Sequence, residues 1–144
     1  MASGTLRRMA DPITDADIER ARVGYRKFRE GDPSTFDDWD PDVEIHLPKG
    51  LPGGGALRGV LEFLEFQEGM REHWEEAYPE PEEFLSAGDK LIVLGTWHAR
   101  ARKTGRTAAV PFAHVYEVRD GKTVYFRNYT DSSETLESLE EPGE

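Results

Sequence analysis

The sequence predicts an α+β fold in which a curved antiparallel sheet wraps around a few helices and leaves a cavity closed at one end. Two observations carry this prediction. The first half of the chain reads as helix, helix, strand and helix, whereas the second half reads as four long alternating segments. In addition, one face of residues 110–131 carries aromatic residues with a few polar groups among them. This composition is typical of a pocket lining.

The composition limits the partners of the chain. Its 144 residues are enough for one domain with a substantial core, and its formal net charge is -11. This charge argues against nucleic acid and against an anionic membrane surface, because no basic face remains to hold phosphates. The absence of cysteine excludes thiolate chemistry and is compatible with a cytoplasmic location, which we expect.

The chain is expected to form a single domain over residues 13–140. A flexible tail at residues 1–12 precedes it and an acidic tail at residues 141–144 follows it. Arg7 and Arg8 are not followed by an apolar segment, so this start does not resemble a secretion signal. No apolar run approaches the length of a membrane span.

The first helix has clear start and end signals. Thr14, with Asp17 three residues later, predicts a capped beginning, and Gly31-Asp32-Pro33 predicts the end. The elements expected next are a short helix at residues 34–39, a strand at 43–47, an entrance loop at 51–55 and a third helix from about residue 60 to 77.

The second half predicts strands at residues 82–85 and 90–102, followed by a hairpin centred on Asp120-Gly121. A two-residue turn would pair Arg119 with Lys122, whereas a three-residue loop with a glycine bulge would pair Val118 with Lys122. The choice decides which residues share a face. We expect the bulged register, because it separates apolar from charged residues. Its inner face consists of Phe112, His114, Tyr116, Val118, Val124, Phe126, Asn128 and Thr130.

A pocket lined by this face would receive further side chains from the helices and from the strand at 90–102. The expected ligand-binding residues are Tyr25, Gln67, Trp97, Phe112, Tyr116, Phe126, Asn128 and Thr130. The aromatic members fit a plain core as well as a cavity wall. Asn128 and Thr130 could orient a carbonyl or hydroxyl group of an otherwise apolar ligand.

His114 is the one histidine expected on the concave face, and its role is open. It could be a core histidine satisfied by Asn128 or a backbone carbonyl, a hydrogen-bonding group for a ligand, or a catalytic general acid/base. His46, His73 and His98 are expected at the surface. No spacing among the four histidines resembles a metal motif, so neither a metal nor another cofactor is expected.

The opposite face of the sheet mixes aromatic residues with arginine, which suits a protein interface. We expect a homodimer through this outer sheet face. Its residues are His98, Arg100, Arg102, Tyr125, Arg127, Tyr129 and Asp131.

Several short motifs are spread along the chain between about residue 15 and residue 136. They are Tyr25, Phe28 and Gly31-Asp32, the segments 42–46 and 51–59, Phe112-Ala-His114, Asp120-Gly-Lys122 and Asn128-Tyr-Thr-Asp131. Through these motifs the chain resembles the SnoaL-like branch of the nuclear-transport-factor-2-like superfamily. The resemblance implies a cone-shaped sheet wrapped around three helices, with a short C-terminal helix, that often dimerises through the outer sheet face. The superfamily includes polyketide cyclases, ketosteroid isomerases, dehydratases and epoxide hydrolases, as well as proteins without known catalysis.

The catalytic residues of these relatives do not carry over. The general-base aspartate of ketosteroid isomerases corresponds to Leu47 here, and their oxyanion tyrosine corresponds to Gly24. The arginine and two aspartates of the epoxide hydrolases correspond to Gly95, Trp97 and Asn128, and the cyclase aspartate corresponds to Asn128 again. Asparagine cannot shuttle a proton at neutral pH.

Three functions therefore compete. We favour a protein that binds a small, largely apolar oxygenated or polyketide-like molecule in its pocket. The alternatives are a cyclase or isomerase that uses His114 as acid/base, and a non-enzymatic dimeric interaction module whose cavity is filled by its own aromatic side chains.

Overall fold

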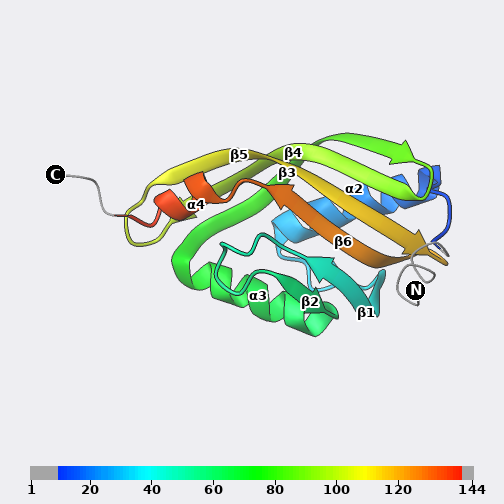
Figure 1. Cartoon of the computed structure of the whole chain (residues 1–144), viewed down its shortest axis with the longest axis horizontal. Helices are drawn as coiled ribbons and strands as arrows, with labels where there is room; N and C mark the ends of the chain where they lie inside the picture. The colour runs from blue at the N-terminus through cyan, green and yellow to red at the C-terminus, as the bar shows by residue number, and fades with distance from the viewer. Residues whose placement is uncertain (1–9, 141–144) are drawn as a thin grey trace.

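The computed structural model describes residues 10–140. The expected tails at residues 1–12 and 141–144 lie outside the described residues, except for residues 10–12. The elements are α2 (Asp15–Glu30), β1 (Trp39–His46), β2 (Ala56–Arg58), α3 (Val60–His73), β3 (Trp74–Ala87), β4 (Lys90–Ala101), β5 (Thr107–Arg119), β6 (Lys122–Thr130) and α4 (Ser133–Glu137) (Figure 1). The expected α+β fold is confirmed.

One curved, unclosed sheet of six strands forms the body of the protein, in the order β2-β1-β6-β5-β4-β3. Figure 1 shows α2 lying across one face of the sheet, while α3 runs below β1 and β2. Neighbouring strands are antiparallel except β1 and β6, which run parallel, so the sheet is mixed rather than wholly antiparallel. No hairpin joins β1 to β6, and the long connection through α3 and four strands allows the parallel arrangement.

Helix α2 begins and ends where the sequence predicts. The Asp17 amide donates to Thr14 Oγ1 at 3.2 Å and the Thr14 amide donates to Asp17 Oδ2 at 3.0 Å, which forms a reciprocal capping box. Gly31 ends the helix with a φ of 72°, a left-handed conformation that glycine adopts without strain.

The expected short helix at residues 34–39 is wrong. Residues 33–38 form consecutive turns, in which the amides of Thr35, Asp37 and Trp39 donate to the carbonyl three residues earlier. The Asp32 carboxylate also accepts from the Ser34 amide at 2.8 Å, which favours a turn over a helix. Strand β1 consequently begins at Trp39, four residues earlier than predicted.

The third helix is shorter than predicted, since it ends at His73 instead of residue 77. Trp74 begins β3, a 14-residue strand that contains the expected strand at 82–85. Pro79 and Pro81 lie within it, and they are tolerated because β3 is an edge strand that pairs with β4 alone.

The β5–β6 hairpin has the two-residue turn, so the expected three-residue loop is wrong. Asp120 and Gly121 have φ values of 53° and 75°, and Arg119 pairs with Lys122. Two consecutive left-handed residues are what a tight hairpin of this kind requires, and Asp-Gly supplies them. A bulge beyond Val118 then restores the expected faces, because Tyr116 pairs with Phe126 and His114 with Asn128.

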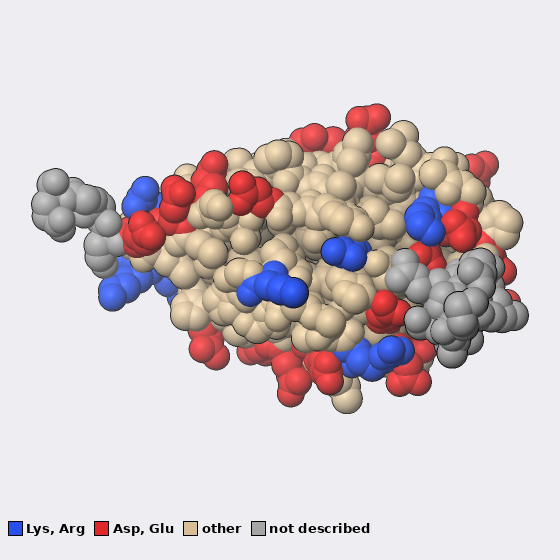
Figure 2. Space-filling view, in the orientation of Figure 1, with Lys and Arg blue, Asp and Glu red and all other residues tan. Residues whose placement is uncertain are grey.

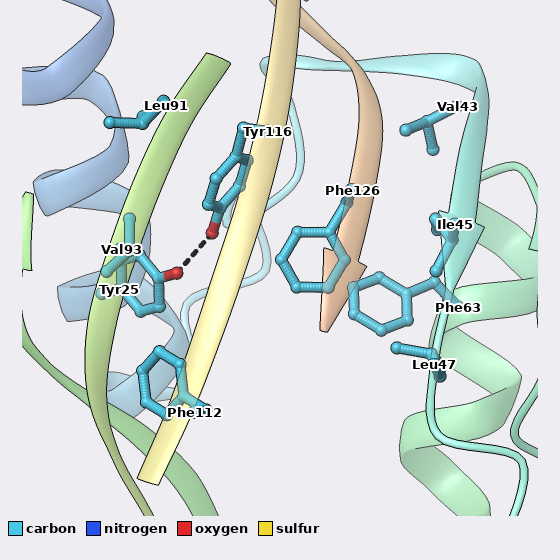
Figure 3. Close-up of a cluster of buried hydrophobic side chains, with 10 residues drawn as sticks. All are labelled: Tyr25, Val43, Ile45, Leu47, Phe63, Leu91, Val93, Phe112, Tyr116 and Phe126. Carbon is cyan, nitrogen blue, oxygen red and sulfur yellow. Dashed lines mark hydrogen bonds between the residues drawn. The ribbon is translucent and has the colours of Figure 1, made fainter. Parts of the chain in front are cut away.

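The core lies between the concave face of the sheet and the helices. Its main cluster consists of Tyr25, Val43, Ile45, Leu47, Phe63, Leu91, Val93, Phe112, Tyr116 and Phe126 (Figure 3). A second cluster surrounds Trp74, which is 1% exposed and donates through Nε1 to Ser138 Oγ at 2.9 Å. This hydrogen bond connects the residue that follows α4 to the first residue of β3.

Candidate functional site

A cavity of about 290 Å³ lies on the concave side of the sheet. Its wall is mainly apolar and comes from α2, the turns at residues 33–38, α3 and the inner faces of the strands. Its apolar lining includes Phe28, Phe36, Trp39, Leu47, Phe63, Phe66, Met70, Leu91, Trp97 and Phe126.

Seven of the nine expected site residues line this cavity. They are Tyr25, Gln67, Trp97, His114, Tyr116, Phe126 and Asn128. Phe112 and Thr130 are not among the lining residues. The Phe112 ring stacks on His114 at a centroid distance of 4.0 Å. It also packs against Gly95, so closely that a Cβ at this position would lie 2.7 Å from the ring. The Thr130 hydroxyl instead donates to the Pro111 carbonyl at 2.8 Å.

Three of the lining side chains form a buried chain of hydrogen bonds. Tyr116 Oη donates to Tyr25 Oη at 2.6 Å, and Tyr25 Oη is 2.6 Å from His114 Nδ1. Figure 3 shows the two phenols facing one another from β5 and α2. We assign the chain the direction Tyr116 to Tyr25 to His114. In this direction Nδ1 accepts from Tyr25, and the neutral ring carries its proton on Nε2; the opposite direction would place that proton on Nδ1.

The environment keeps His114 neutral. The side chain is 4% exposed, and burial lowers its pKa from 6.5 to about 3. Burial also raises the pKa of both tyrosines, well above 10 for Tyr25, where the hydrogen bond and charge of Tyr116 add to the effect. At neutral pH the inner wall therefore presents uncharged donors and acceptors.

Asn128 lies directly beside this chain of hydrogen bonds. It is the cross-strand partner of His114, so the two side chains leave the sheet on the same face. Its Oδ1 atom is buried and accepts no hydrogen bond from the described residues. A buried amide oxygen without a donor is costly, by about 1–3 kcal/mol.

Charged side chains also line the cavity, namely Asp17, Arg20, Lys27, Asp38, Arg71, Glu75 and Arg102. Asp17 and Arg20 form an ion pair of 2.6 Å at the end near the hairpin turn. Arg71 and Arg102 lie near the opposite end, where Arg102 Nε donates to the Arg71 carbonyl at 2.6 Å. Arg102 was expected on the outer face. The alternation does not extend to it, because β4 ends at Ala101.

Sequence reasoning missed Trp39 as a lining residue. Its ring stacks on Phe63 at 5.6 Å and lies 5.3 Å from Phe126. The available signal was its even spacing from Val43 and Ile45, which would have placed it on the same face once the strand was extended.

Two further features bear on the class of site. Among residues 10–140, no group of three or more histidine, aspartate or glutamate side chains is arranged to hold a metal ion. None of the helices formed by those residues is long and apolar enough to cross a membrane.

The outer face of the sheet has a mixed character. His46 Nε2 lies 2.7 Å from Glu44 Oε2. His98 Nε2 lies 2.8 Å from Glu80 Oε1. Tyr129 is 50% exposed and the Arg127 guanidinium lies 4.8 Å from its ring centroid. Figure 2 shows few charges in the middle of the face in view, with acidic side chains gathered toward its edges.

A SnoaL-like domain model matches residues 21–126 of the chain. No curated protein sequence matches it.

Solved structures share the whole fold. A nuclear-transport-factor-2-like protein of unknown function from Burkholderia pseudomallei is 28% identical, with a TM-score of 0.80 over 88% of this chain and 98% of that one. TerC, co-crystallised with polyporic acid, is 28% identical and has a TM-score of 0.79. The match covers 87% of this chain and 98% of TerC. A Jannaschia protein assigned as a SnoaL-like polyketide cyclase is 15% identical and has a TM-score of 0.77; the match covers 92% of this chain and 97% of that one. At this identity the similarity supports the fold alone.

Proposed function

Because the chain belongs to the SnoaL-like family, we propose that it binds a small, largely apolar oxygenated molecule in the cavity between its sheet and helices. The observation that supports this most is the pairing of an apolar cavity of about 290 Å³ with a few neutral polar groups on its inner wall. That combination is typical of small-molecule sites. The similarity to TerC, whose crystals contain polyporic acid, adds support.

Binding is favoured over acid–base catalysis. An enzyme that used His114 as general acid/base near neutral pH would need an imidazole that titrates near that pH. Burial lowers the pKa of His114 to about 3, and its Nδ1 is occupied by Tyr25. The neighbouring Asn128 has no proton to exchange at neutral pH. These side chains are suited to orienting a bound molecule.

A thermal-shift screen tests this function. The library consists of polycyclic ketones, phenols, terpenoids, quinones and aromatic acids. A ligand at a hundredfold its dissociation constant adds about 2.7 kcal/mol of stability, which raises the melting temperature of a domain of this size by several degrees. Ala21→Trp, which fills the cavity from α2, is expected to abolish the shift. The function is refuted if every compound leaves the melting temperature unchanged, or if hits bind Ala21→Trp equally well.

The outer sheet face supports a second, separate proposal, that two copies pair through it. Tyr129 is half exposed there, next to Arg127, and an aromatic–arginine pair suits a protein interface. Arg127→Glu is expected to convert the dimer to a monomer in sedimentation velocity, with the circular dichroism spectrum unchanged. A variant that stays dimeric would show that this face is not the interface.

A further inference from the structure

The inner wall of the cavity carries one donor and one acceptor side by side. His114 and Asn128 are a direct cross-strand pair, and both line the cavity. Side chains in such a pair leave the sheet roughly 5 Å apart, a separation that a single ligand atom can bridge.

The donor is Nε2–H of His114, assigned from the direction of the chain of hydrogen bonds behind it. Tyr116 donates to Tyr25, and Tyr25 donates to His114 Nδ1. Each phenol has one proton, so a chain that runs in this direction places the proton of the neutral imidazole on Nε2. Nε2 takes no hydrogen bond within residues 10–140, which leaves this N–H for a ligand acceptor.

The acceptor is the amide oxygen of Asn128. Oδ1 is buried and receives no donor from the described residues, although the side chain lines the cavity. The terminal torsion of asparagine is soft, so the amide can turn toward a ligand at little cost. A ligand donor would recover the hydrogen bond that the protein alone leaves unmade.

The geometry points to a hydroxyl group as the part of the ligand that this pair recognises. A hydroxyl oxygen accepts from His114 Nε2–H while its proton goes to Asn128 Oδ1. A ketone or ether oxygen satisfies the histidine alone and leaves the amide oxygen unpaired. The preferred ligands are therefore phenols or alcohols with an apolar ring system. This inference rests on the proposed binding function and specifies the chemistry of its inner end.

A matched set of small aromatic compounds tests the inference by calorimetric titration. Naphthol donates and accepts, whereas methoxynaphthalene and naphthaldehyde only accept. Naphthol is expected to bind the unaltered protein on the order of tenfold more tightly than either, which is the usual effect of one unmade buried hydrogen bond. Equal affinities, or tighter binding of naphthaldehyde, would overturn the hydroxyl inference while leaving the cavity proposal intact. No binding of any of the three would count against both.

Substitution of the acceptor separates hydrogen bonding from size. In Asn128→Leu, the preference for naphthol over methoxynaphthalene is expected to disappear, because no acceptor remains. Thr96→Val is the control, since Thr96 does not line the cavity and its hydroxyl donates to Glu82 at 2.9 Å; it is expected to keep the tenfold preference. A preference that persists in Asn128→Leu would overturn the assignment to Asn128. If that variant does not fold, the compound series on the unaltered protein tests the same chemistry.

Discussion

Replacement of Tyr25 by phenylalanine tests the buried chain of hydrogen bonds that organises the cavity. The substitution removes a single oxygen from a side chain that is 8% exposed and leaves the ring in place. That oxygen is the middle member of the chain, because it accepts from Tyr116 and donates to His114, each at 2.6 Å.

The expected loss of stability follows from the number of groups left without partners. Tyr25→Phe orphans a hydroxyl donor on Tyr116 and a ring acceptor on His114, and each buried orphan costs about 1–3 kcal/mol. Partial relaxation toward the cavity lowers the sum, so we expect a loss of about 2–4 kcal/mol in the free energy of unfolding. Tyr116→Phe removes only the donor at the end of the chain and leaves Tyr25 bound to His114. We expect it to cost about 1 kcal/mol.

Urea unfolding followed by circular dichroism measures both values, with Tyr129→Phe as the control. Tyr129 is 50% exposed, so its substitution should change the stability by less than about 0.5 kcal/mol. The order of losses should be Tyr25, then Tyr116, then Tyr129. A loss for Tyr116→Phe that equals or exceeds that of Tyr25→Phe would refute the central position of Tyr25 in the chain of hydrogen bonds. A Tyr25→Phe variant as stable as the unaltered protein would show that the buried chain of hydrogen bonds does not contribute to stability.

The remaining predictions concern pH, two glycines and the second core cluster. The pKa of His114 is lowered to about 3 when folded, so the unfolded chain takes up the proton first and stability falls as the pH falls from about 6.5 toward 3. Between pH 7 and pH 5, His114 should lower the free energy of unfolding in urea by about 2 kcal/mol, and this loss should be absent in His114→Gln. If His114→Gln loses as much stability between the two pH values as the unaltered protein, the lowered pKa of His114 is contradicted. An alanine Cβ at Gly69 in α3 would meet no atom within 4 Å, so Gly69→Ala should raise the free energy of unfolding by about 1 kcal/mol. An alanine Cβ at Gly95 would lie 2.1 Å from the Glu80 carbonyl oxygen, so Gly95→Ala should lower the melting temperature by several degrees. Equal effects of the two alanines in a thermal melt would be inconsistent with these contacts. Trp74→Phe removes the donor to Ser138 and should cost about 1–3 kcal/mol in urea unfolding; a neutral result would mean that this bond does not hold the C-terminal segment.

The sequence predicted the fold class and most of the cavity lining because alternation along a strand is a local signal. The inner positions of β5 and β6 follow from it, and so does the pairing of His114 and Asn128 on one face. The helix start at Thr14 and the end at Gly31 are equally local, since capping side chains and left-handed glycines act within one turn.

The errors arose where one stretch of sequence is compatible with two local structures, and the missed contacts join residues that are far apart in the chain. Residues 34–39 contain helix-compatible side chains, but the hydrogen bonds of Asp32 favour turns there. The β5–β6 turn was assigned from facial sorting alone, and a bulge farther along the hairpin produces the same sorting with a tighter turn. The Tyr116–Tyr25–His114 chain joins residues about 90 positions apart, a proximity that no local pattern reveals.

A crystal structure of the protein with the tightest-binding compound from the thermal-shift screen tests the proposed function most directly. We expect the compound between the sheet and α2, with its polar end in contact with both His114 and Asn128. A compound bound outside the cavity, or an inner wall repacked so that no space remains beside these two residues, would contradict the proposal that this protein is a small-molecule binder.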